Sequence, residues 1–582
     1  MANEGAGKLK PQRASTLDSW AMRWAAFSGA REDQVFLVLT LLIGALTGLA
    51  VVAFIVLTEH FGSRLYPFGS SPWRRLFVPI GGSLAMGYLL YRYFPDARGS
   101  GVPQTKAALF AREGKITLGT VFGKFFCTSA TLASGIPLGR EGPAVQVGGG
   151  IASVLGRTLG LRAERVKQLI PVGAAAAVAA AFNTPLAAVL FALEEVVGDM
   201  HAPVLGSVVL ASATSWGVLR LLLGNDPLFQ VPQYQLINPW ELVVYGILGL
   251  AGGLVSVAFT QLLLRTRKWF LKLPRKTVWF QPVAGGVLVG VMGWFVPQVM
   301  GVGYSHVGDA LNDQLALKLM VVLLALKLVA TAIAYGSGNA GGIFGPSLFL
   351  GAMLGGALGG AAHHLFPAYV ATPGAYALVG MGAAFAGIVR APMTSVVMIF
   401  EITRDYAVIV PLMISNLVSY FIASRLQKQP IYEALADQDG IHLPAGRGVR
   451  TPRRVVMQVM RPTSDCLTAA DDLRETVARV AQGAQRSWPV CDHTGVIGVV
   501  TLEQLQIAAS QESKTKIVDL LDSREFPHLH SDHSLDLALD RLGATHTDVL
   551  PVVSRANIHE LLGIVRLQDV LRAYGVNNGP ES

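Results

Sequence analysis

The sequence predicts a helical membrane protein made of two repeated halves, followed by a smaller soluble α/β region. Only 15% of the 582 residues are charged and 52% are hydrophobic, whereas soluble domains carry roughly 25% charged residues. The charge is uneven, because about 23% of residues 449–582 are charged against about 12% of the first 448. Several motifs of the charge-poor part also occur twice. This composition excludes disordered, collagen-like and disulfide-stapled chains.

The charge-poor part contains uncharged segments long enough to cross a bilayer, which needs roughly 20 apolar residues. The long ones cover 34–58, 168–193, 242–264 and 277–308, and shorter ones cover 76–91, 202–219 and 407–424. The longest uncharged segment, 328–389, is interrupted by Gly and Pro, so it must hold several short or tilted helices. Irregular backbone at membrane depth is tolerated only where protein buries it or where it lines a polar cavity. We therefore expect the functional site at these breaks.

An internal duplication relates the two halves of this part. Pro185 precedes Glu194 by the same interval as Pro392 precedes Glu401, and two Gly-Pro pairs, at 142–143 and 345–346, precede similar glycines. The first set is offset by about 207 residues and the second by about 203, which predicts repeats over about 35–220 and 242–430. Chance likeness between Gly-rich membrane helices is the alternative. Duplicated, broken-helix halves are typical of transporters in which half-helix N-termini point at an anion near the midplane.

Three Gly-rich elements, at 99–103, 139–143 and 342–346, end in proline and lead into apolar segments. Proline is favoured in the first turn of a helix and glycine allows a tight turn before it. Each element therefore predicts a helix N-terminus with free amide hydrogens, and three such ends could converge on one dehydrated anion. Taken singly, each is more typical of close helix packing.

Acidic residues are rare in this part, and four of them occur at these motifs. Glu141 lies inside the second element, where its carboxylate could take the place of an anion and leave when protonated. The alternative for Glu141 is a salt bridge with Arg140 or Lys124. Of the pair Glu194 and Glu195, one could relay protons while the other is structural. The repeat counterpart of Glu194, Glu401, favours the structural role for Glu194.

Four ordered motifs give the charge-poor part a family resemblance. The segments 99–103, 139–143, 342–346 and 428–432 resemble, in order and spacing, the signature elements of the CLC chloride channel and transporter family over about residues 30–440. The resemblance implies an all-α polytopic fold of two inverted repeats with broken helices, over 31–440, and a homodimer with one anion pathway per subunit. It implies that chloride contacts the hydroxyls of Ser100 and Tyr432 and the backbone amides of Ile343 and Phe344.

The same resemblance makes Glu141 the external gating glutamate and Glu195 the internal proton-transfer residue. Because exchangers of this family generally keep both acids, we expect chloride/proton antiport, and an uncoupled, gated chloride channel is the alternative. Ser100 resembles the chloride-selecting form, and the intact 99–103 element speaks against the fluoride-exporting branch. Gln104 departs from relatives that carry Glu after the proline.

The charged tail is predicted to contain two similar units, at 453–510 and 511–575, after a linker at 441–452. Two short motifs recur at offsets of about 62 and 65 residues, each in a β-rich stretch followed by a helical pattern. The tail resembles a cytoplasmic pair of cystathionine-beta-synthase (CBS) domains. Each unit keeps half of that family's adenosine-binding pattern, as Thr501 in the first and Asp569 in the second. An adenine nucleotide is one expectation, and a dimerisation platform without any cofactor is the other.

Other functions are disfavoured. The basic excess lies in the membrane half, where it is typical of cytoplasmic loops, so no nucleic-acid partner is expected. An intramembrane serine hydrolase could be built from Ser337, Ser347, His363 and His364, but no corroborating motif accompanies them, so the chain is not expected to be an enzyme. The three cysteines, Cys127, Cys466 and Cys491, are expected to be reduced, buried small side chains that hold no metal.

The location follows from the N-terminal residues. Residues 1–30 mix Lys, Arg, Asp and Trp without the apolar core of a secretory signal. We therefore expect both termini in the cytoplasm, with a bacterial inner membrane as the host bilayer.

Overall fold

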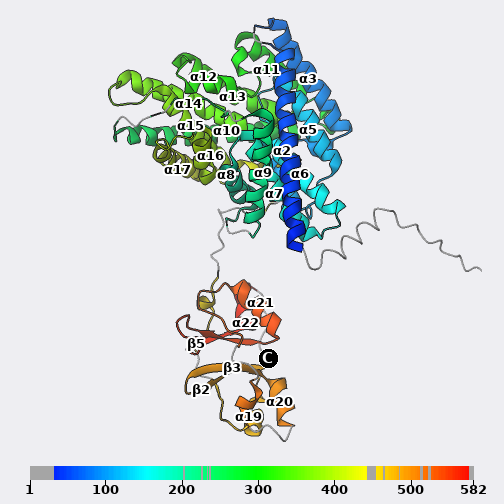
Figure 1. The fold of residues 1–582 in the computed structure, drawn as a ribbon, viewed down its shortest axis with the longest axis vertical. Helices are drawn as coiled ribbons and strands as arrows, with labels where there is room; N and C mark the ends of the chain where they lie inside the picture. The colour runs from blue at the N-terminus through cyan, green and yellow to red at the C-terminus, as the bar shows by residue number, and fades with distance from the viewer. Residues whose placement is uncertain are drawn as a thin grey trace, which may run out of the picture. The chain divides into compact units, whose positions relative to one another are not determined.

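The chain forms two compact units in the computed structural model, residues 1–446 and 447–582, which Figure 1 draws as ribbons. Each unit is considered by itself. The structure describes residues 32–575 apart from 68, 201–202, 225–226, 233, 235–237, 442, 444–453, 463–465, 484, 511–515 and 522–525. The expected N-terminal segment 1–30 and nearly all of the expected linker lie outside these residues.

The first unit is helical, and its helices form two sets of eight that correspond in order. The first set comprises α2 (Glu32–Leu65), α3 (Pro72–Arg92), α4 (Val102–Phe110), α5 (Leu118–Ala133), α6 (Glu141–Thr158), α7 (Ala163–Phe182), α8 (Pro185–Phe191) and α9 (Leu205–Leu223). The second set comprises α10 (Glu241–Leu271), α11 (Pro282–Phe295), α12 (Tyr304–Leu311), α13 (Leu317–Gly336), α14 (Phe344–Leu365), α15 (Pro373–Val389), α16 (Pro392–Thr403) and α17 (Ile409–Leu426). A last helix, α18 (Ile431–Gln438), follows them, and short 3₁₀ turns are η1 (Pro95–Ala97), η3 (Arg275–Thr277) and η4 (Pro297–Val299).

The helix lengths match a membrane protein with interrupted spans. Seven segments of the described chain are long and apolar enough to cross a bilayer, among them Val35–Leu65 and Glu241–Leu271. The uncharged stretch 328–389 is divided among α13, α14 and α15, as its glycines and prolines predict.

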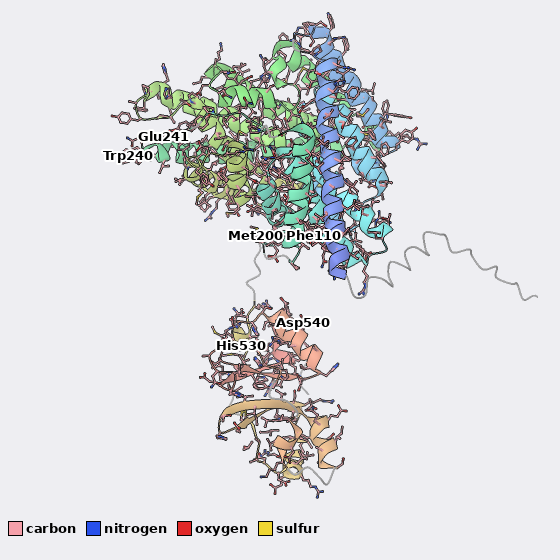
Figure 2. The ribbon with its side chains drawn as sticks, in the orientation of Figure 1. Phe110, Met200, Trp240, Glu241, His530 and Asp540 are labelled. Carbon is pink, nitrogen blue, oxygen red and sulfur yellow. A yellow bond between two sulfur atoms is a disulfide. The ribbon has the colours of Figure 1, made fainter. Side chains whose placement is uncertain are left out.

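Glu241 and Trp240, which Figure 2 labels, mark the start of α10. The Glu241 carboxylate is buried and accepts hydrogen bonds from Ala371 N at 2.7 Å and the Tyr376 hydroxyl at 3.0 Å.

Glycine contacts hold corresponding helix pairs together in the two halves. A Cβ atom on Gly148 of α6 would lie 2.2 Å from the carbonyl oxygen of Gly173 on α7. In the second half, a Cβ on Gly351 of α14 would lie 2.2 Å from the carbonyl oxygen of Gly380 on α15. Backbones approach this closely only where side chains are absent. The same packing solution therefore occurs twice, as expected for a duplicated fold.

Two repeat-related glutamates connect the halves by capping each other's short helices. Glu194 Oε2 accepts hydrogen bonds from Thr394 N at 2.8 Å and Thr394 Oγ1 at 2.9 Å, in the first turn of α16. Glu401, on α16, accepts hydrogen bonds from Leu186 N at 3.0 Å and Ala187 N at 2.7 Å, in the first turn of α8. A carboxylate at a helix N-terminus satisfies free amides and the helix dipole. Glu194 is thus a structural residue in this fold.

The second unit is an α/β structure with two short antiparallel ladders. Its first half contains β1 (Leu467–Thr468), α19 (Leu473–Val480), β2 (Ser487–Asp492), β3 (Gly495–Thr501) and α20 (Leu502–Ala509). Its second half contains α21 (Leu535–Thr545), β4 (Val549–Val553), β5 (Leu561–Arg566) and α22 (Leu567–Ala573), and η5 (Val456–Gln458) and η6 (Ile517–Leu520) are single turns. The strand order is β1-β2-β3 in one sheet, with β1 parallel and β3 antiparallel to β2, and β4 pairs with β5 in the other.

The two halves of this unit exchange their entry segments. Val456 packs in the hydrophobic core of the second half, with Leu529 and Val565, although it precedes the first half in sequence. Ile517 conversely packs in the core of the first half. Arg461 also pairs with Ile564 of β5 through two backbone hydrogen bonds of 2.9 Å. Each core is therefore completed by chain from beyond the boundary expected between residues 510 and 511.

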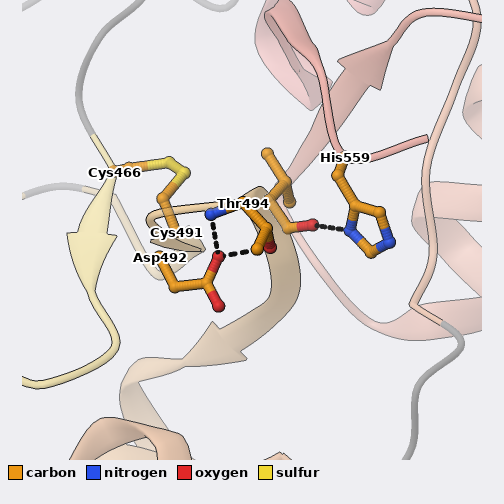
Figure 3. Close-up of a disulfide and its surroundings, with 6 residues drawn as sticks. Cys466, Cys491, Asp492, Thr494 and His559 are labelled. Atoms are coloured by element: carbon orange, nitrogen blue, oxygen red, sulfur yellow. Dashed lines mark hydrogen bonds between the residues drawn. A yellow bond between two sulfur atoms is a disulfide. The ribbon is translucent and has the colours of Figure 1, made fainter. Parts of the chain in front are cut away.

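Two of the cysteines correct the expectation that all three are reduced. Cys466 and Cys491 are joined by a disulfide across 25 residues, with their Cα atoms 5.7 Å apart, as Figure 3 shows. The physical reason is the parallel pairing of β1 and β2, which places Thr468 opposite Cys491 and so brings the start of β1 beside it. Because β pairing is not visible in the spacing of the cysteines, the sequence did not indicate this bond. Cys127 is free and buried, as expected.

Candidate functional site

The three Gly-rich elements meet backbone to backbone in the middle of the first unit. Gly139 and Gly342 exchange two hydrogen bonds, N–H to carbonyl, each of 2.7 Å. A Cβ on Gly101, whose φ is 102°, would lie 2.1 Å from the carbonyl oxygen of Gly142, and one on Gly142 would lie 2.4 Å from that of Ser100. Any side chain at these glycines would push the loops apart. The glycines therefore bring the starts of α4, α6 and α14 together.

Two hydroxyl groups are buried at this meeting point. Ser100 and Tyr432 are both fully buried; within the described part of the chain the Tyr432 hydroxyl has no hydrogen-bond partner, and the Ser100 hydroxyl has only a contact with Tyr335. Tyr335 lies beside Ser100 and near Tyr432. A buried hydroxyl without a partner costs free energy, so such groups point to a ligand. Two of them fit an anion, which accepts hydrogen bonds from O–H donors.

The other two predicted contacts are Ile343, the N-cap residue of α14, and Phe344, its first residue. Both residues are fully buried, and in the described chain neither amide donates to another backbone oxygen. The Phe344 ring packs against Phe182 and Phe385, with centroids 4.7 and 4.4 Å away. The aromatic packing fixes the first turn of α14, so that its amide hydrogens form a rigid, electropositive end.

Glu141 is docked at that same helix end. Its side chain is fully buried, and Oε2 accepts a hydrogen bond of 3.2 Å from the amide of Gly345 in the first turn of α14. The other oxygen, Oε1, accepts a hydrogen bond from the hydroxyl of Tyr304. The carboxylate thus occupies a position that suits an anion at a helix N-terminus.

Neither salt bridge that would have explained Glu141 structurally is formed. The Arg140 guanidinium pairs instead with Glu59, with Nη1 3.0 Å from Oε1. The Lys124 ammonium is fully buried and donates to the carbonyl oxygens of Ala97 and Gly99, at 2.9 and 2.6 Å. Lys124 therefore holds the loop that carries Ser100, and Glu141 is bound by hydrogen bonds alone among the described residues.

Glu195 lies in a π-helical segment, η2 (Ala192–Val197), that continues α8. Its Oε1 is 2.9 Å from the ammonium of Lys106 on α4, and both side chains are less than a tenth exposed. π-Helical turns are rare and often occur at functional sites. Because the neighbouring Glu194 is engaged as a helix cap, Glu195 is the acid of this pair that is left for the predicted proton relay.

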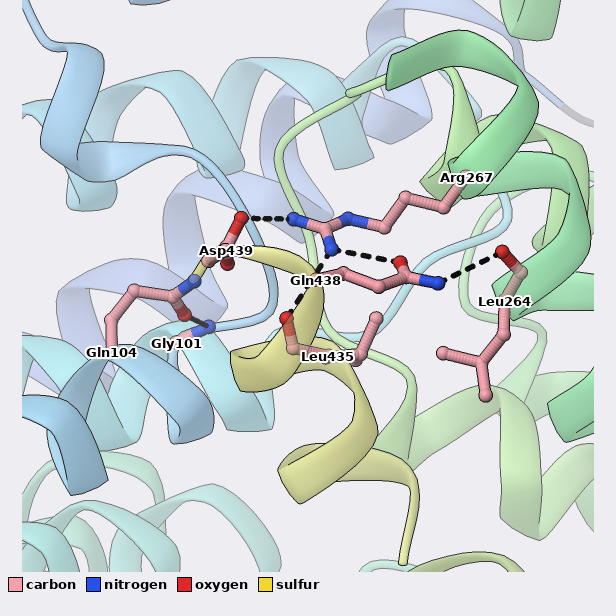
Figure 4. Close-up of polar contacts among 7 residues, drawn as sticks. All are labelled: Gly101, Gln104, Leu264, Arg267, Leu435, Gln438 and Asp439. Atoms are coloured by element: carbon pink, nitrogen blue, oxygen red, sulfur yellow. Dashed lines mark hydrogen bonds and ion pairs between the residues drawn. The ribbon is translucent and has the colours of Figure 1, made fainter. Parts of the chain in front are cut away.

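Helix α18, which carries Tyr432, is anchored by Arg267 of α10, as Figure 4 shows. The Arg267 guanidinium contacts Asp439 Oδ1 at 2.5 Å, Gln438 Oε1 at 2.9 Å and the Leu435 carbonyl at 3.3 Å. Gln104, which departs from the family pattern, accepts a hydrogen bond of 2.8 Å from Gly101 N through its side-chain oxygen. An uncharged amide thus fixes the turn after Ser100.

Two residues of this site were missed from the sequence. Lys106 gave no signal, because its partner Glu195 lies 89 residues away. Tyr304 did have a signal, since it follows Gly301 and Gly303, which repeat the Gly99 and Gly101 pair about 202 residues later.

The two residues predicted for a nucleotide are both engaged within the chain. The Thr501 hydroxyl caps α20 by accepting a hydrogen bond of 3.3 Å from Gln504 N. Asp569 is buried, and its Oδ1 is 2.5 Å from Arg461 Nη2, while Oδ2 has no partner among the described residues.

A duplicated membrane fold with a buried cradle of helix N-termini, hydroxyls and a docked carboxylate defines an anion-transport protein. The sequence profile of the family described as voltage gated chloride channel matches residues 81–424, and that of the CBS domain matches residues 518–576. The chain therefore belongs to the voltage-gated chloride channel, or CLC, family, and its C-terminal region contains a CBS domain.

Individual relatives agree with this assignment. The H(+)/Cl(-) exchange transporter ClcA of Vibrio campbellii is 34% identical over 366 residues, which are 62% of this chain and 78% of that protein. The crystal structure of a slow cyanobacterial Cl-/H+ antiporter matches with a TM-score of 0.64 and 28% identity, covering 69% of this chain and 97% of the other. A eukaryotic CLC transporter shares the fold, with a TM-score of 0.61 and 20% identity over 92% of this chain and 97% of the other. The predicted fold class is thereby confirmed, and these relatives are transporters rather than enzymes.

Proposed function

We propose that the protein exchanges chloride for protons across the membrane. The observation that carries this proposal is Glu141, a fully buried carboxylate that accepts the Gly345 amide at the start of α14. A carboxylate held by a helix N-terminus competes with an anion for the same amides only while it is ionised. The exchangers among the relatives support the assignment of chloride and protons as the transported ions.

The mechanism assigns each predicted residue one task. Ser100 and Tyr432 donate their hydroxyl hydrogens to chloride, and the amides of Ile343 and Phe344 donate at the N-terminus of α14. When Glu141 is protonated it leaves the Gly345 amide, so that chloride can occupy its place. A bound chloride near Glu141 favours the protonated form through like-charge repulsion. Release of that proton returns the carboxylate to its docked position, which expels chloride.

Glu195 supplies the inner proton step in this proposal. It lies beside Lys106, and both side chains are almost fully shielded from solvent. A carboxylate at such a position can accept and release a proton. An uncoupled channel needs no acid at this position. The presence of both Glu141 and Glu195 therefore favours antiport over the channel alternative.

Transport by the purified protein in liposomes tests the proposal. With equal chloride on both sides and an acidic interior, protons that leave through an exchanger must carry chloride inward. We expect chloride to accumulate against its own gradient, and to do so only while the pH difference lasts. An internal chloride concentration that stays equal to the external one, while the pH difference lasts, would support the uncoupled channel.

Assembly and location are part of the same proposal. The family resemblance supports a homodimer with one pathway per subunit. It also supports an orientation in which both termini face the cytoplasm of a bacterial cell, with the protein in the inner membrane. Membrane residence is supported by the seven segments, in the part of the chain that the structure describes, that are long and apolar enough to cross a bilayer.

For the tail, we propose a structural platform rather than a nucleotide sensor. The Thr501 hydroxyl is used as a helix cap and one oxygen of Asp569 is used by Arg461. A ribose would have to displace that arginine before it could bind both carboxylate oxygens.

Thermal unfolding of the full-length protein with ATP, ADP or AMP tests this role of the tail. A ligand that binds only the folded state raises the apparent stability by about 2.7 kcal/mol at 100 times its Kd. We expect no change in unfolding temperature for the tail with millimolar nucleotide. A clear rise that disappears in the Asp569→Ala variant would show instead that the tail is a nucleotide site.

A further inference from the structure

The loop that precedes α12 is the repeat counterpart of the loop that carries Ser100. In each half, a fully buried lysine donates to two carbonyl oxygens of its loop, from Lys124 on α5 and from Lys327 on α13. The distances are 2.9 and 2.6 Å to Ala97 and Gly99, and 3.0 and 2.6 Å to Val299 and Gly301. The two loops are therefore built and fixed in the same way.

The two loops present different side chains. The first loop presents the buried hydroxyl of Ser100, whereas the second leads into Tyr304, the first residue of α12. Gly303, with φ of 85°, provides the left-handed turn that starts this helix. The Tyr304 hydroxyl donates a hydrogen bond to Glu141 Oε1. The duplication thus delivers one hydroxyl to the anion site and another to the carboxylate beside it.

The Tyr304 ring is fixed in this direction by its neighbours. The Phe229 ring meets it edge to face, with centroids 5.7 Å apart. The Arg140 guanidinium lies 5.5 Å from the centroid of the ring and is itself paired with Glu59 at 3.0 Å. Such contacts limit the rotation of the ring. The hydroxyl is therefore preorganised to meet Glu141 in its docked position.

We propose that Tyr304 is a positioning residue for transport, a latch that holds Glu141 in its docked, ionised state. The inference rests on the proposed exchange function. A hydrogen bond from a hydroxyl to a carboxylate is charge-assisted and roughly twice as strong as a neutral one. Tyr304 thus stabilises the ionised form of Glu141 over the protonated, undocked form. Among the described residues, the titratable groups near Glu141 are its chain neighbour Arg140, Tyr304 on α12 and Tyr432 on α18, and Lys327 on α13 lies behind Gly303, next to Tyr304.

Removal of the latch should change the pH dependence of transport and leave coupling intact. In the Tyr304→Phe variant, Glu141 still binds the Gly345 amide but has lost its second donor, so protonation and undocking occur at higher pH. We expect the pH of half-maximal chloride turnover to rise by about one unit, equivalent to about 1.4 kcal/mol. Protons should still accompany chloride, because Glu141 and Glu195 remain.

The test is chloride flux by full-length variants in liposomes, measured across a range of pH. The matched control is Tyr234→Phe, which removes a buried tyrosine hydroxyl that donates to the Leu311 carbonyl at the far end of the same helix. Tyr304→Leu is a second variant that lacks the same hydroxyl, and it should give the same shift as Tyr304→Phe.

Three outcomes distinguish a latch from a merely structural tyrosine. The latch predicts that Tyr304→Phe shifts the profile, that Tyr234→Phe does not, and that Tyr304→Phe has no effect once Glu141 is replaced by Ala. An unshifted profile, an equal shift in the Tyr234 control, or a shift that persists in the Glu141→Ala background would overturn the inference. Failure of the exchange function itself would appear separately, as wild-type protein that moves chloride without protons.

Discussion

Glu141→Ala is expected to convert the protein into an uncoupled chloride pathway. The alanine cannot dock at the Gly345 amide, so the N-terminus of α14 stays open to anions at every pH. It also cannot carry a proton, so the number of protons moved per chloride should fall to zero. Chloride flux should persist and become nearly independent of pH between 4 and 8, a range across which ionisation of a single carboxylate would otherwise be visible. Parallel recordings of chloride with an ion electrode and of protons with a pH electrode measure both effects.

A matched control separates this effect from the loss of any buried acid. Glu241 is as buried as Glu141 and also accepts hydrogen bonds, from Ala371 N and Tyr376, but it lies outside the site. Glu241→Ala should lower stability and leave the ratio of protons to chloride unchanged. Proton coupling that survives in Glu141→Ala, or that disappears equally in the control, would contradict the gating role.

Glu195→Gln is expected to abolish proton movement while chloride continues to flow. Glutamine keeps the shape of the side chain but cannot take up a proton at this position. Its neighbour complicates the measurement, because Lys106 is 2.9 Å away and less than a tenth exposed. Removal of one partner of a buried ion pair costs about 3–5 kcal/mol, since the other charge is left without compensation.

The double variant Glu195→Gln/Lys106→Met distinguishes the two effects. Methionine removes the stranded charge and fills a similar volume, so the unfolding temperature should recover most of what the single variant loses. Proton transport should stay absent, because no acid has been restored. If the double variant regained proton movement, Glu195 would be a stabilising partner of Lys106 rather than a proton carrier.

Much of the fold could be predicted because short sequence motifs recur in both halves and reveal the duplication. The Gly-Pro elements mark helix starts by their own backbone preferences, and Pro185 and Pro392 with their following glutamates mark the short paired helices. The structural role of Glu194 was also predictable, since its repeat counterpart Glu401 makes the reciprocal cap. The helix starts depend on residues close together in sequence, and the role of Glu194 follows from comparing the two repeats.

The rest depends on tertiary contacts that no local pattern encodes. Lys106 finds Glu195 only because α4 packs beside η2, and Cys466 meets Cys491 only because β1 and β2 run in parallel. The exchange of entry segments in the tail has the same origin, since Val456 packs in a core formed by residues more than 70 positions later. Tyr304 lies between these cases. The repeated glycines before it are visible in the sequence, but its contact with Glu141 became apparent only from the structure.

Proton movement against its own gradient, driven by chloride alone, tests the central claim most directly. Liposomes that contain the purified protein are loaded with high chloride, diluted into low chloride at slightly higher external pH, and held near zero potential with K⁺ and valinomycin. Our account predicts that chloride leaving the liposomes drives protons inward, so that the already more acidic interior acidifies further. Chloride efflux without any inward proton movement, or with protons flowing only outward down their gradient, would contradict it.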